Sequence, residues 1–340
     1  MRTIEADSVN EAYVAGLSYL RQHGESQDSR AGKVIVAPTP VTTVYRNPRQ
    51  RVLFNVKRDA NPFFHLMESL WMLAGRNDAT WLDLFVKDFS SRFAEEGGIQ
   101  HGAYGFRWRN HFDLEGGGCP NLPDQLQTVC QMLMANPDDR RVVLQMWDPV
   151  ADLGAAKNDV PCNLCVLPRV RTEIASALTR ETQQVLDITV CCRSNDAIWG
   201  AYGANAVHFS VLQEYLAARI GVGVGRYYQI SNNFHAYETA LEKIGFPRLE
   251  GSPYHDGSAE ITPIVTVSSL IDIDLRSFFT APEDQSYGND FFPDIALPML
   301  RAAQHWREGD VVAAEQALCV MPSRSDWRVA GMAWLGRRRK

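Results

Sequence analysis

The chain has 340 residues, of which 45% are hydrophobic, 22% are charged and 24 are glycine. This composition is typical of a folded globular protein and excludes collagen-like, low-complexity and disordered proteins. With 34 Lys and Arg against 40 Asp and Glu, the net charge is −6, so we expect no general binding to nucleic acid. Any phosphate group must then be held by a local cluster of cationic side chains.

Membrane segments and disulfide bonds are also disfavoured. The sequence contains no run of about 18 apolar residues, and residues 1–7 lack the basic start and apolar core of a signal peptide. We therefore expect a cytoplasmic protein that does not contact a membrane. The seven cysteines are odd in number and widely spaced, which indicates free thiols.

Hydrophobic periodicity predicts helices and strands in mixed order. The expected helices, in chain order, are residues 8–22, 62–74, 121–135, 204–220, 293–308 and 311–319. The expected strands are residues 34–36, 52–56, 141–146, 162–170, 185–192, 226–230 and 261–273. Because this order has no regular strand-helix-strand rhythm, we expect an α+β fold. No repeat or linker divides the chain, so we expect one domain over residues 1–340.

Two arginine-containing motifs could bind a phosphate group. Arg140 and Arg141 follow an Asn-Pro-Asp-Asp turn, whereas Arg193 and Ser194 end an expected strand. A guanidinium group matches two phosphate oxygens at once, and a hydroxyl group adds a further hydrogen bond. Each pair by itself is more often plain surface charge.

The cysteines offer one candidate nucleophile and a weak metal signal. Cys162 follows Pro161 at the end of a polar loop, where an expected strand begins, and this position favours accessibility. The Cys162-Asn163-Leu164-Cys165 spacing suits half of a zinc site or a redox pair, but no second pair of ligands stands at zinc spacing. We therefore expect no bound metal.

Three further side chains stand out from their surroundings. Glu68 lies in an otherwise apolar helix, where a carboxylate is costly unless it is ion-paired or takes part in catalysis. His235 and Tyr237 follow a polar loop and fit either a ligand-binding pair or a buried histidine beside an edge tyrosine. The basic residues 337–340 are expected to form a solvated tail.

The strongest signal is the order of six motifs. Along the chain they are residues 68–75 (ESLWMLAG), 104–109 (YGFRWR), 139–141 (DRR), 161–162 (PC), 193–196 (RSND) and 235–237 (HAY). With this order, between Ser29 and Tyr237, the chain resembles the thymidylate synthase superfamily, which includes the deoxypyrimidine monophosphate hydroxymethylases of phages. The resemblance implies a three-layer fold with a large bent mixed sheet flanked by helices, and a homodimer whose sheets pack face to face. If a phage encodes the chain, its place is the host cytoplasm.

The resemblance also implies which residues bind the substrates. The phosphate of a pyrimidine nucleoside monophosphate would contact both subunits, through Arg30, Arg193 and Ser194 of one and Arg140 and Arg141 of the other. The ribose and the base would contact four more residues, His235, Tyr237, Asn163 and Asn205.

The implied chemistry is the transfer of a one-carbon unit from the co-substrate 5,10-methylenetetrahydrofolate to carbon 5 of the pyrimidine. Cys162 would add to carbon 6, which makes carbon 5 nucleophilic, and nearby arginine charge would lower the pKa of its thiol. Glu68 and Tyr104 would handle protons. Asp196 and Trp108 would contact the folate.

The chain departs from the synthases at positions that affect the choice of base. Asn163 and Leu167 stand where the synthases have His and Gln. Asn205 reaches the base-reading position only if one extra residue precedes it, and its amide can both donate to and accept from uracil. Deoxycytidylate hydroxymethylases have Asp there, but no Asp lies between Ala204 and Ser210. We therefore expect dUMP to be preferred over dCMP.

The C-terminal part, about residues 275–340, is expected to be a divergent extension without the short apolar end that seals the site in the synthases. A site open to water favours a hydroxymethyl over a methyl product. We therefore expect a hydroxymethylase, with a thymidylate synthase proper as the alternative. Two more distant alternatives are a cysteine hydrolase that uses Cys162, His235 and Asn233, and a nucleotide-binding regulator without catalytic activity.

Overall fold

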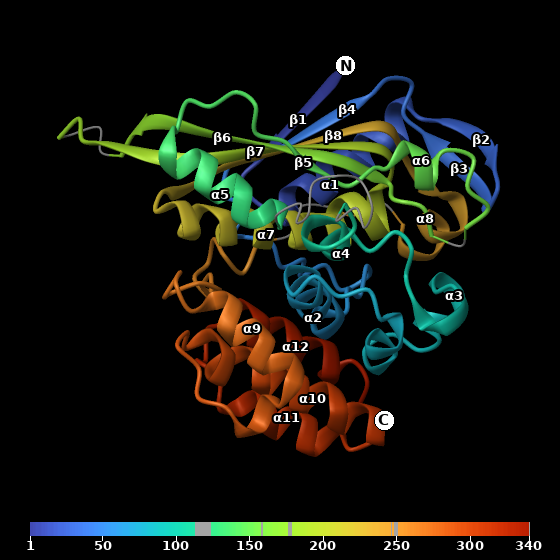
Figure 1. The fold of residues 1–340 in the computed structure, drawn as a ribbon. Helices are drawn as coiled ribbons and strands as arrows, with labels where there is room; N and C mark the ends of the chain where they lie inside the picture. The colour runs from blue at the N-terminus through green and yellow to red at the C-terminus, as the bar shows by residue number, and fades with distance from the viewer. Residues whose placement is uncertain (113–123, 158, 176–178, 246, 248–250, 340) are drawn as a thin grey trace.

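The computed structural model describes residues 1–112, 124–157, 159–175, 179–245, 247 and 251–339. A large sheet forms the upper layer of the molecule in Figure 1, and helices cover its lower face. A second group of helices, formed by C-terminal residues, lies beneath α2 (Pro62–Leu73). The helix α2 therefore lies between the sheet layer and the C-terminal group.

The sheet contains eight strands within the described residues, and its main path is β1-β4-β8-β7-β6-β5. These strands span, in that order, Arg2–Ala6, Val41–Tyr45, Gly223–Tyr237, Thr182–Asp196, Asn163–Ile174 and Leu144–Gln145. The hairpin of β2 (Glu25–Ser29) and β3 (Gly32–Val36) joins this path along β8. The expected α+β fold with a large mixed sheet flanked by helices is confirmed.

Strand register brings the ends of three long strands to one place. The strands β7 and β8 are parallel, and Ser194 of β7 lies opposite Asn233 of β8. The strand β6 is antiparallel to β7, so β6 begins where β7 ends. There the backbone N–H of Arg193 donates to the carbonyl oxygen of Cys162 (2.9 Å). Motif residues from three distant parts of the sequence thus meet at one end of the sheet.

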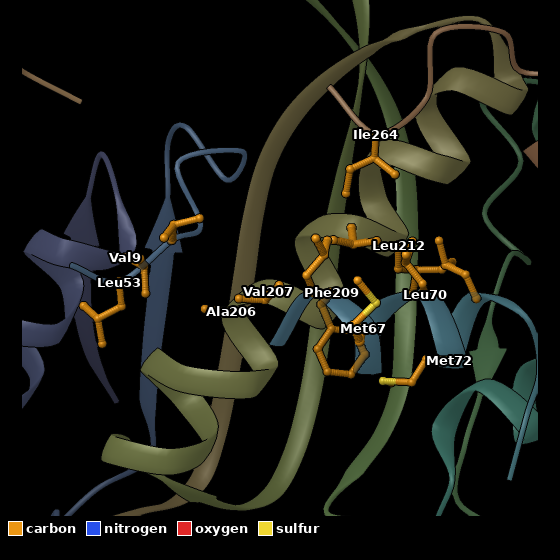
Figure 2. Packing of buried hydrophobic residues seen from close by; sticks show 14 of the residues in the cluster. Val9, Leu53, Met67, Leu70, Met72, Ala206, Val207, Phe209, Leu212 and Ile264 are labelled. Carbon is orange, nitrogen blue, oxygen red and sulfur yellow. The ribbon is translucent and has the colours of Figure 1, made fainter. Parts of the chain in front are cut away.

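Two helices form the centre of the molecule. The helix α7 (Asn205–Ile220) packs against β7 and β8 and also against α2. Met67 and Leu70 of α2 lie beside Phe209 and Leu212 of α7 in the hydrophobic core, as Figure 2 shows. Because most residues of both helices are buried, neither helix has the one-sided hydrophobic pattern of a surface helix.

Local capping determines where the first two long helices begin. The Ser8 hydroxyl accepts from the backbone N–H of Glu11 at the start of α1 (Val9–His23), and Asn61 caps α2, whose first residue is proline. The other α-helices are α3 (Phe89–Phe93), α4 (Tyr104–Arg109), α5 (Gln125–Ala135), α6 (Pro149–Asp152), α8 (Glu238–Ile244), α9 (Ile271–Thr280), α10 (Leu297–Glu308), α11 (Val311–Cys319) and α12 (Asp326–Gly336). None of the helices found in the described ranges combines the length and hydrophobicity that crossing a membrane requires.

Two expected strands are irregular segments in the structure. In residues 52–56, the backbone N–H groups of Val52 and Phe54 donate to side-chain oxygens of other segments. In residues 261–273, two consecutive N–H groups donate to the Asn289 side chain, and the last three residues already belong to α9. Side-chain acceptors satisfy these backbone groups, so no neighbouring strand is needed.

Two of the other expected strands and one expected helix differ from the structure in extent. The expected strand 141–146 contributes only β5, whereas the expected strand 226–230 is part of the longer β8. The expected helix 121–135 is helical from Gln125, and residues 121–123 lie outside the described residues.

The C-terminal helices form a compact group on the far side of α2. Both α10 and α12 contact α2, and α11 packs against both of them (Figure 1). Arg337 and Arg339 at the chain end are exposed, as expected of a solvated tail, but the end is held by ion pairs and is not free. Arg337 and Arg338 donate to the carboxylate of Asp59. Arg339 pairs with Glu315, and residue 340 lies outside the described residues.

We predict that Arg51→Met lowers the free energy of unfolding by about 3–5 kcal/mol, because it leaves the Glu214 carboxylate buried without its charge partner. The two side chains form an ion pair and are 1% and 5% exposed. Urea denaturation measures the change. The matched control is Arg46→Met, which breaks an ion pair with Asp7 whose side chains are 46% and 43% exposed. This control should cost less than about 1 kcal/mol, and equal losses in the two variants would contradict the prediction.

Candidate active site

Two cavities lie next to the strand ends described above. The first has a volume of about 540 Å³ and is lined by residues of α2, α4, α7 and the loops beside them. The second has a volume of about 280 Å³ and lies between the β2–β3 hairpin and the ends of β7 and β8. Most of the site residues expected from the sequence divide between these two cavities or lie beside them.

The second cavity collects residues that were expected to bind phosphate and ribose. Arg30, Ser194, His235 and Tyr237 all line it. Because β3 pairs with the end of β8, the turn of the hairpin carries Arg30 to the strand ends. This turn needs a residue with positive φ, which Gly32 supplies at +117°. A guanidinium group, a hydroxyl group and an imidazole around one small cavity suit a phosphate ester.

Hydrogen bonding and burial prepare the second cavity for a polar ligand. Nδ1 of His235 lies 2.7 Å from Oδ1 of Asn233, a contact that orients the imidazole ring. Burial raises the pKa of Tyr237 above its usual value, so its hydroxyl group remains a hydrogen-bond donor at neutral pH.

The first cavity collects residues that were expected to act on the base and on protons. Glu68, Tyr104 and Asn205 line it from α2, α4 and α7. Burial raises the pKa of Tyr104 well above its usual range, which keeps its hydroxyl protonated. Much of the remaining wall is aromatic: Phe64, Trp71, Phe89, Phe93 and Trp199. Such a wall accepts a flat heterocyclic ring.

Cys162 lines neither cavity, but its backbone contacts Tyr104 of the first and Arg193, the chain neighbour of Ser194 in the second. Its backbone N–H donates to Oη of Tyr104 in the first cavity (3.3 Å). Burial raises the pKa of the Cys162 thiol and Asp159 adds to this effect, whereas the positive charges of Arg193 and Arg30 lower it. The two arginine charges lower this pKa in the expected direction, but desolvation outweighs them and the net shift is upward.

Arg193 braces the loop that carries the thiol. Its Nε donates to the carbonyl oxygen of Pro161 (2.9 Å) and its Nη2 to that of Val160 (3.0 Å). The guanidinium carbon also lies 5.6 Å from the centre of the Trp147 ring. Arg193 thus holds the backbone just before Cys162 and lines neither cavity, and its role in phosphate binding stays a prediction.

A chain of buried amides holds Asn205 in one orientation. Nδ2 of Asn163 donates to Oδ1 of Asn205 (3.2 Å), and Nδ2 of Asn205 donates to Oδ1 of Asn195 (3.1 Å). Nδ2 of Asn195 then donates to the side chains of Gln229 (3.0 Å) and Ser231 (2.9 Å). Each link fixes which end of the next amide is oxygen and which is nitrogen.

One extra residue is accommodated just before Asn205. The segment η3 (Ala197–Ala204) is π-helical, and Gly203 inside it departs from helical dihedral angles. A π-helical turn takes up one residue more than an α-helical turn. This geometry is compatible with the expected extra residue, and the role of Asn205 in reading the base stays a prediction. Oδ1 of Asp196 caps the segment, and Asp196 lines neither cavity.

Three expected site residues lie elsewhere. Trp108 is 1% exposed and packs edge to face on Phe209, with ring centres 6.2 Å apart. This contradicts its expected contact with the folate, because core side chains enclose it. Arg140 and Arg141 lie in an exposed turn before β5, where Arg141 pairs with Asp139 (2.7 Å). Their expected role in the site of a second subunit stays a prediction.

Sequence reasoning missed His208, which also lines the first cavity. Its Nε2 lies 2.9 Å from Oε2 of Glu68, and the two side chains are 4% and 11% exposed. The signal was present, because His208 follows Asn205 by three residues and His65 precedes Glu68 by three. Side chains three residues apart lie on the same face of a helix.

A resident metal ion has no obvious place here. Across the described ranges of the chain, no group of three His, Cys, Asp or Glu side chains could hold one.

We predict that Cys162 is alkylated by iodoacetamide with an apparent pKa above that of a free thiol, because burial disfavours the thiolate. Arg193→Gln should raise this apparent pKa further, since the variant loses the positive charge that lowers the Cys162 pKa most. The measurement is the alkylation rate against pH, followed on the Cys162 peptide by mass spectrometry. The midpoint is compared and not the absolute rate, because the variant also loosens the loop. A midpoint that falls in Arg193→Gln would contradict the prediction.

Comparison with known proteins places these residues in a family. The chain matches the Thymidylate synthase family over residues 11–281. It is 42% identical to a deoxyuridylate hydroxymethyltransferase of Pseudomonas phage M6 over 353 aligned positions, which cover 100% of this chain and 95% of the relative. It is 32% identical to a deoxyuridylate hydroxymethyltransferase of Bacillus phage SP01, covering 91% and 78% of the two chains. It is 29% identical to a thymidylate synthase of Candida albicans, covering 43% and 52%. The chain belongs to the thymidylate synthase family.

Proposed function

We propose that this protein converts dUMP, 5,10-methylenetetrahydrofolate and water into 5-hydroxymethyl-dUMP and tetrahydrofolate. The observation that carries the proposal is the position of Cys162 between Tyr104, which lines the cavity with an aromatic wall, and Arg193, which precedes Ser194 of the cavity that also holds Arg30. The similarity over the whole chain to a phage deoxyuridylate hydroxymethyltransferase supports the choice of base and product.

The nucleotide binds with its phosphate and ribose in the second cavity. Arg30, Arg193 and Ser194 bind the phosphate, and His235 and Tyr237 hold the ribose. Three of these residues already share the cavity wall with Arg30, which supports the assignment. In a homodimer, Arg140 and Arg141 of the second subunit complete the phosphate site, which agrees with their exposed positions.

Asn205 selects uracil. Its amide uses one acceptor position for Asn163 and one N–H for Asn195. One lone pair and one N–H therefore remain, and they match N3–H and O4 of uracil. Cytosine presents an acceptor at N3 and a donor at its amino group, so the same fixed amide pairs with it less well. Asn163 supports this selection because it holds the Asn205 oxygen in place.

Catalysis begins when the Cys162 sulfur adds to carbon 6 of the uracil. The ring then carries negative charge toward O4, near the Asn205 amide, and carbon 5 becomes nucleophilic. The Tyr104 hydroxyl accepts a hydrogen bond from the backbone N–H of Cys162, so its own O–H is free to donate. It donates to a water and positions it, and this water removes the carbon 5 proton. Glu68 lies in the same cavity and shares the handling of protons.

The first cavity fits the folate co-substrate. A pterin ring is flat and heteroaromatic, and Phe93 and Trp199 offer exposed aromatic surface in the wall. The guanidinium carbon of Arg58 lies 4.1 Å from the Trp199 ring centre and adds a positive charge for an acidic tail. When bound, 5,10-methylenetetrahydrofolate supplies the one-carbon unit that carbon 5 receives. Asp196, at the start of η3, is the residue proposed to contact the pterin.

The choice of a hydroxymethyl product rests on the phage relatives and not on an open site. Arg337 and Arg338 are bound to Asp59, and Asp59 lines the first cavity. The chain end therefore lies at the cavity although it is basic and not apolar. The absence of a short apolar end therefore does not by itself leave the site open to water.

We predict that the enzyme with methylenetetrahydrofolate forms 5-hydroxymethyl-dUMP from dUMP, and that dCMP reacts less well by about 1–3 kcal/mol in activation free energy. This is roughly the cost of leaving a buried polar group without a partner. Mass analysis of products from dUMP, dCMP, UMP and CMP measures both points. Cys162→Ser is the control and should lose turnover while it still binds nucleotide. A methyl product with dihydrofolate would identify a thymidylate synthase instead, and a preference for dCMP would exclude the role of Asn205.

We predict that two inactive variants, Arg141→Ala and Cys162→Ser, regain activity when they are mixed. If subunits exchange at random, about a quarter of the sites combine an intact cysteine with an intact arginine from the other chain. The measurement is hydroxymethylation after exchange, with mixed dimers verified by native mass spectrometry. Activity that stays absent despite proven exchange would mean that one subunit holds the phosphate alone.

A further inference from the structure

We propose that His208 is the general base that activates the water which adds to the one-carbon unit on the pyrimidine. Glu68 orients the His208 ring and compensates the positive charge that the ring gains when it takes up a proton. This inference rests on the proposed function, because only a hydroxymethyl product requires such a water. The juxtaposition of an imidazole and a carboxylate in the wall of the first cavity is its structural basis.

The arrangement of His208 and Glu68 resembles a histidine base whose ring is oriented by a carboxylate. Nε2 of His208 lies 2.9 Å from Oε2 of Glu68, although the angle falls short of a hydrogen bond. The adjacent carboxylate favours the tautomer with the proton on Nε2, which leaves a lone pair on Nδ1. Nδ1 is buried and has no hydrogen-bond partner within the described residues. A buried imidazole nitrogen without a partner is costly unless a water or substrate supplies one.

Sequence position supports the same conclusion. The residue after the nucleophile is Asn163, where the synthases that the chain resembles have a histidine. Asn163 is committed to Asn205 and cannot accept a proton at neutral pH. The imidazoles in this cavity come from other elements, His208 from α7 and His65 from α2.

His208 is the better base of the two histidines. Burial, together with the charges of Arg58 and His208, holds the pKa of His65 well below its usual range. No ion pair joins His65 to a carboxylate among the contacts of the described residues, so an imidazolium there would lack compensation. His208 faces Glu68 directly, and this carboxylate stabilises the imidazolium that forms when a water proton is taken up.

The proposed step balances without a redox partner. After loss of the carbon 5 proton and of tetrahydrofolate, the nucleotide carries an exocyclic methylene group at carbon 5 and the Cys162 sulfur at carbon 6. The water oxygen bonds to the methylene carbon while its proton moves to Nδ1 of His208. The electron pair of the methylene double bond shifts into the ring as an enolate. The enolate then re-forms the bond between carbons 5 and 6 and expels the Cys162 thiolate.

The test separates loss of the carbon 5 proton from capture of water. Enzyme in excess is mixed with [5-³H]dUMP and methylenetetrahydrofolate, and tritium release and 5-hydroxymethyl-dUMP are followed in a single turnover. In the wild type, released tritium and 5-hydroxymethyl-dUMP should appear in equal amounts. In His208→Gln, tritium release should stay within about threefold, whereas hydroxymethyl product should form about 100-fold more slowly, the lower range of a general base. An added thiol should then trap the methylene group as a 5-thiomethyl nucleotide, identified by mass.

His65→Gln is the matched control, since it removes the other imidazole of the cavity without touching the contact to Glu68. Whatever its overall rate, it should keep equal amounts of released tritium and hydroxymethyl product. His208→Asn, checked by thermal melting and by covalent complex formation with 5-fluoro-dUMP, serves as the second variant if the first does not fold. That complex forms before the water step, so it should be retained.

Three results would overturn the proposal. Hydroxymethyl product that keeps pace with tritium release in the folded His208 variants would show that His208 is not the base. Tritium release that falls together with product would place His208 at an earlier step. Uncoupling in His65→Gln of the same size would assign the effect to the cavity in general. A wild-type enzyme that forms only dTMP would instead refute the proposed function itself.

Discussion

The parallel pairing of β7 with β8 is the constraint on which both cavities depend. In this register Ser194 lies opposite Asn233, and Asp196 lies opposite His235. A slip by one residue would turn every following side chain to the other face of the sheet. Ser194 and His235 would then no longer share a cavity. The antiparallel β6 extends the same constraint to Cys162, which immediately precedes β6 and accepts a backbone hydrogen bond from Arg193 near the end of β7.

Buried polar groups fix the orientation of Asn205 in the wall of the first cavity and also limit how this wall can vary. Asn163, Asn195 and Asn205 are almost fully buried, and each finds partners in the same chain of hydrogen bonds. A buried polar group without a partner costs about 1–3 kcal/mol, so removal of one amide affects the next. The same network presents Asn205 in a single orientation. Stability of the core and the proposed choice of base therefore depend on the same bonds.

The C-terminal helices add a layer that the family match does not include. That match ends at residue 281, whereas α10, α11 and α12 follow it. These helices cover the side of α2 that faces away from α7 (Figure 1). They bring two terminal arginines, Arg337 and Arg338, to Asp59 at the wall of the first cavity. The neighbouring Arg58 lies over Trp199 in the same wall, so the extension and the site share one stretch of chain.

The sequence by itself determined the local features of this protein and the order of its motifs along the chain. Ser8 and Asn61 mark the helix starts, and the motif order indicates the family and the candidate nucleophile. These features depend on short-range hydrogen bonds or on residue identity. Only the tertiary structure decided which distant groups meet: Glu68 with His208, and Arg338 with Asp59. It also decided that Trp108 is a core residue and that burial raises the pKa of Cys162. Desolvation and charge pairing depend on neighbours far away in the chain, and local patterns do not encode those neighbours.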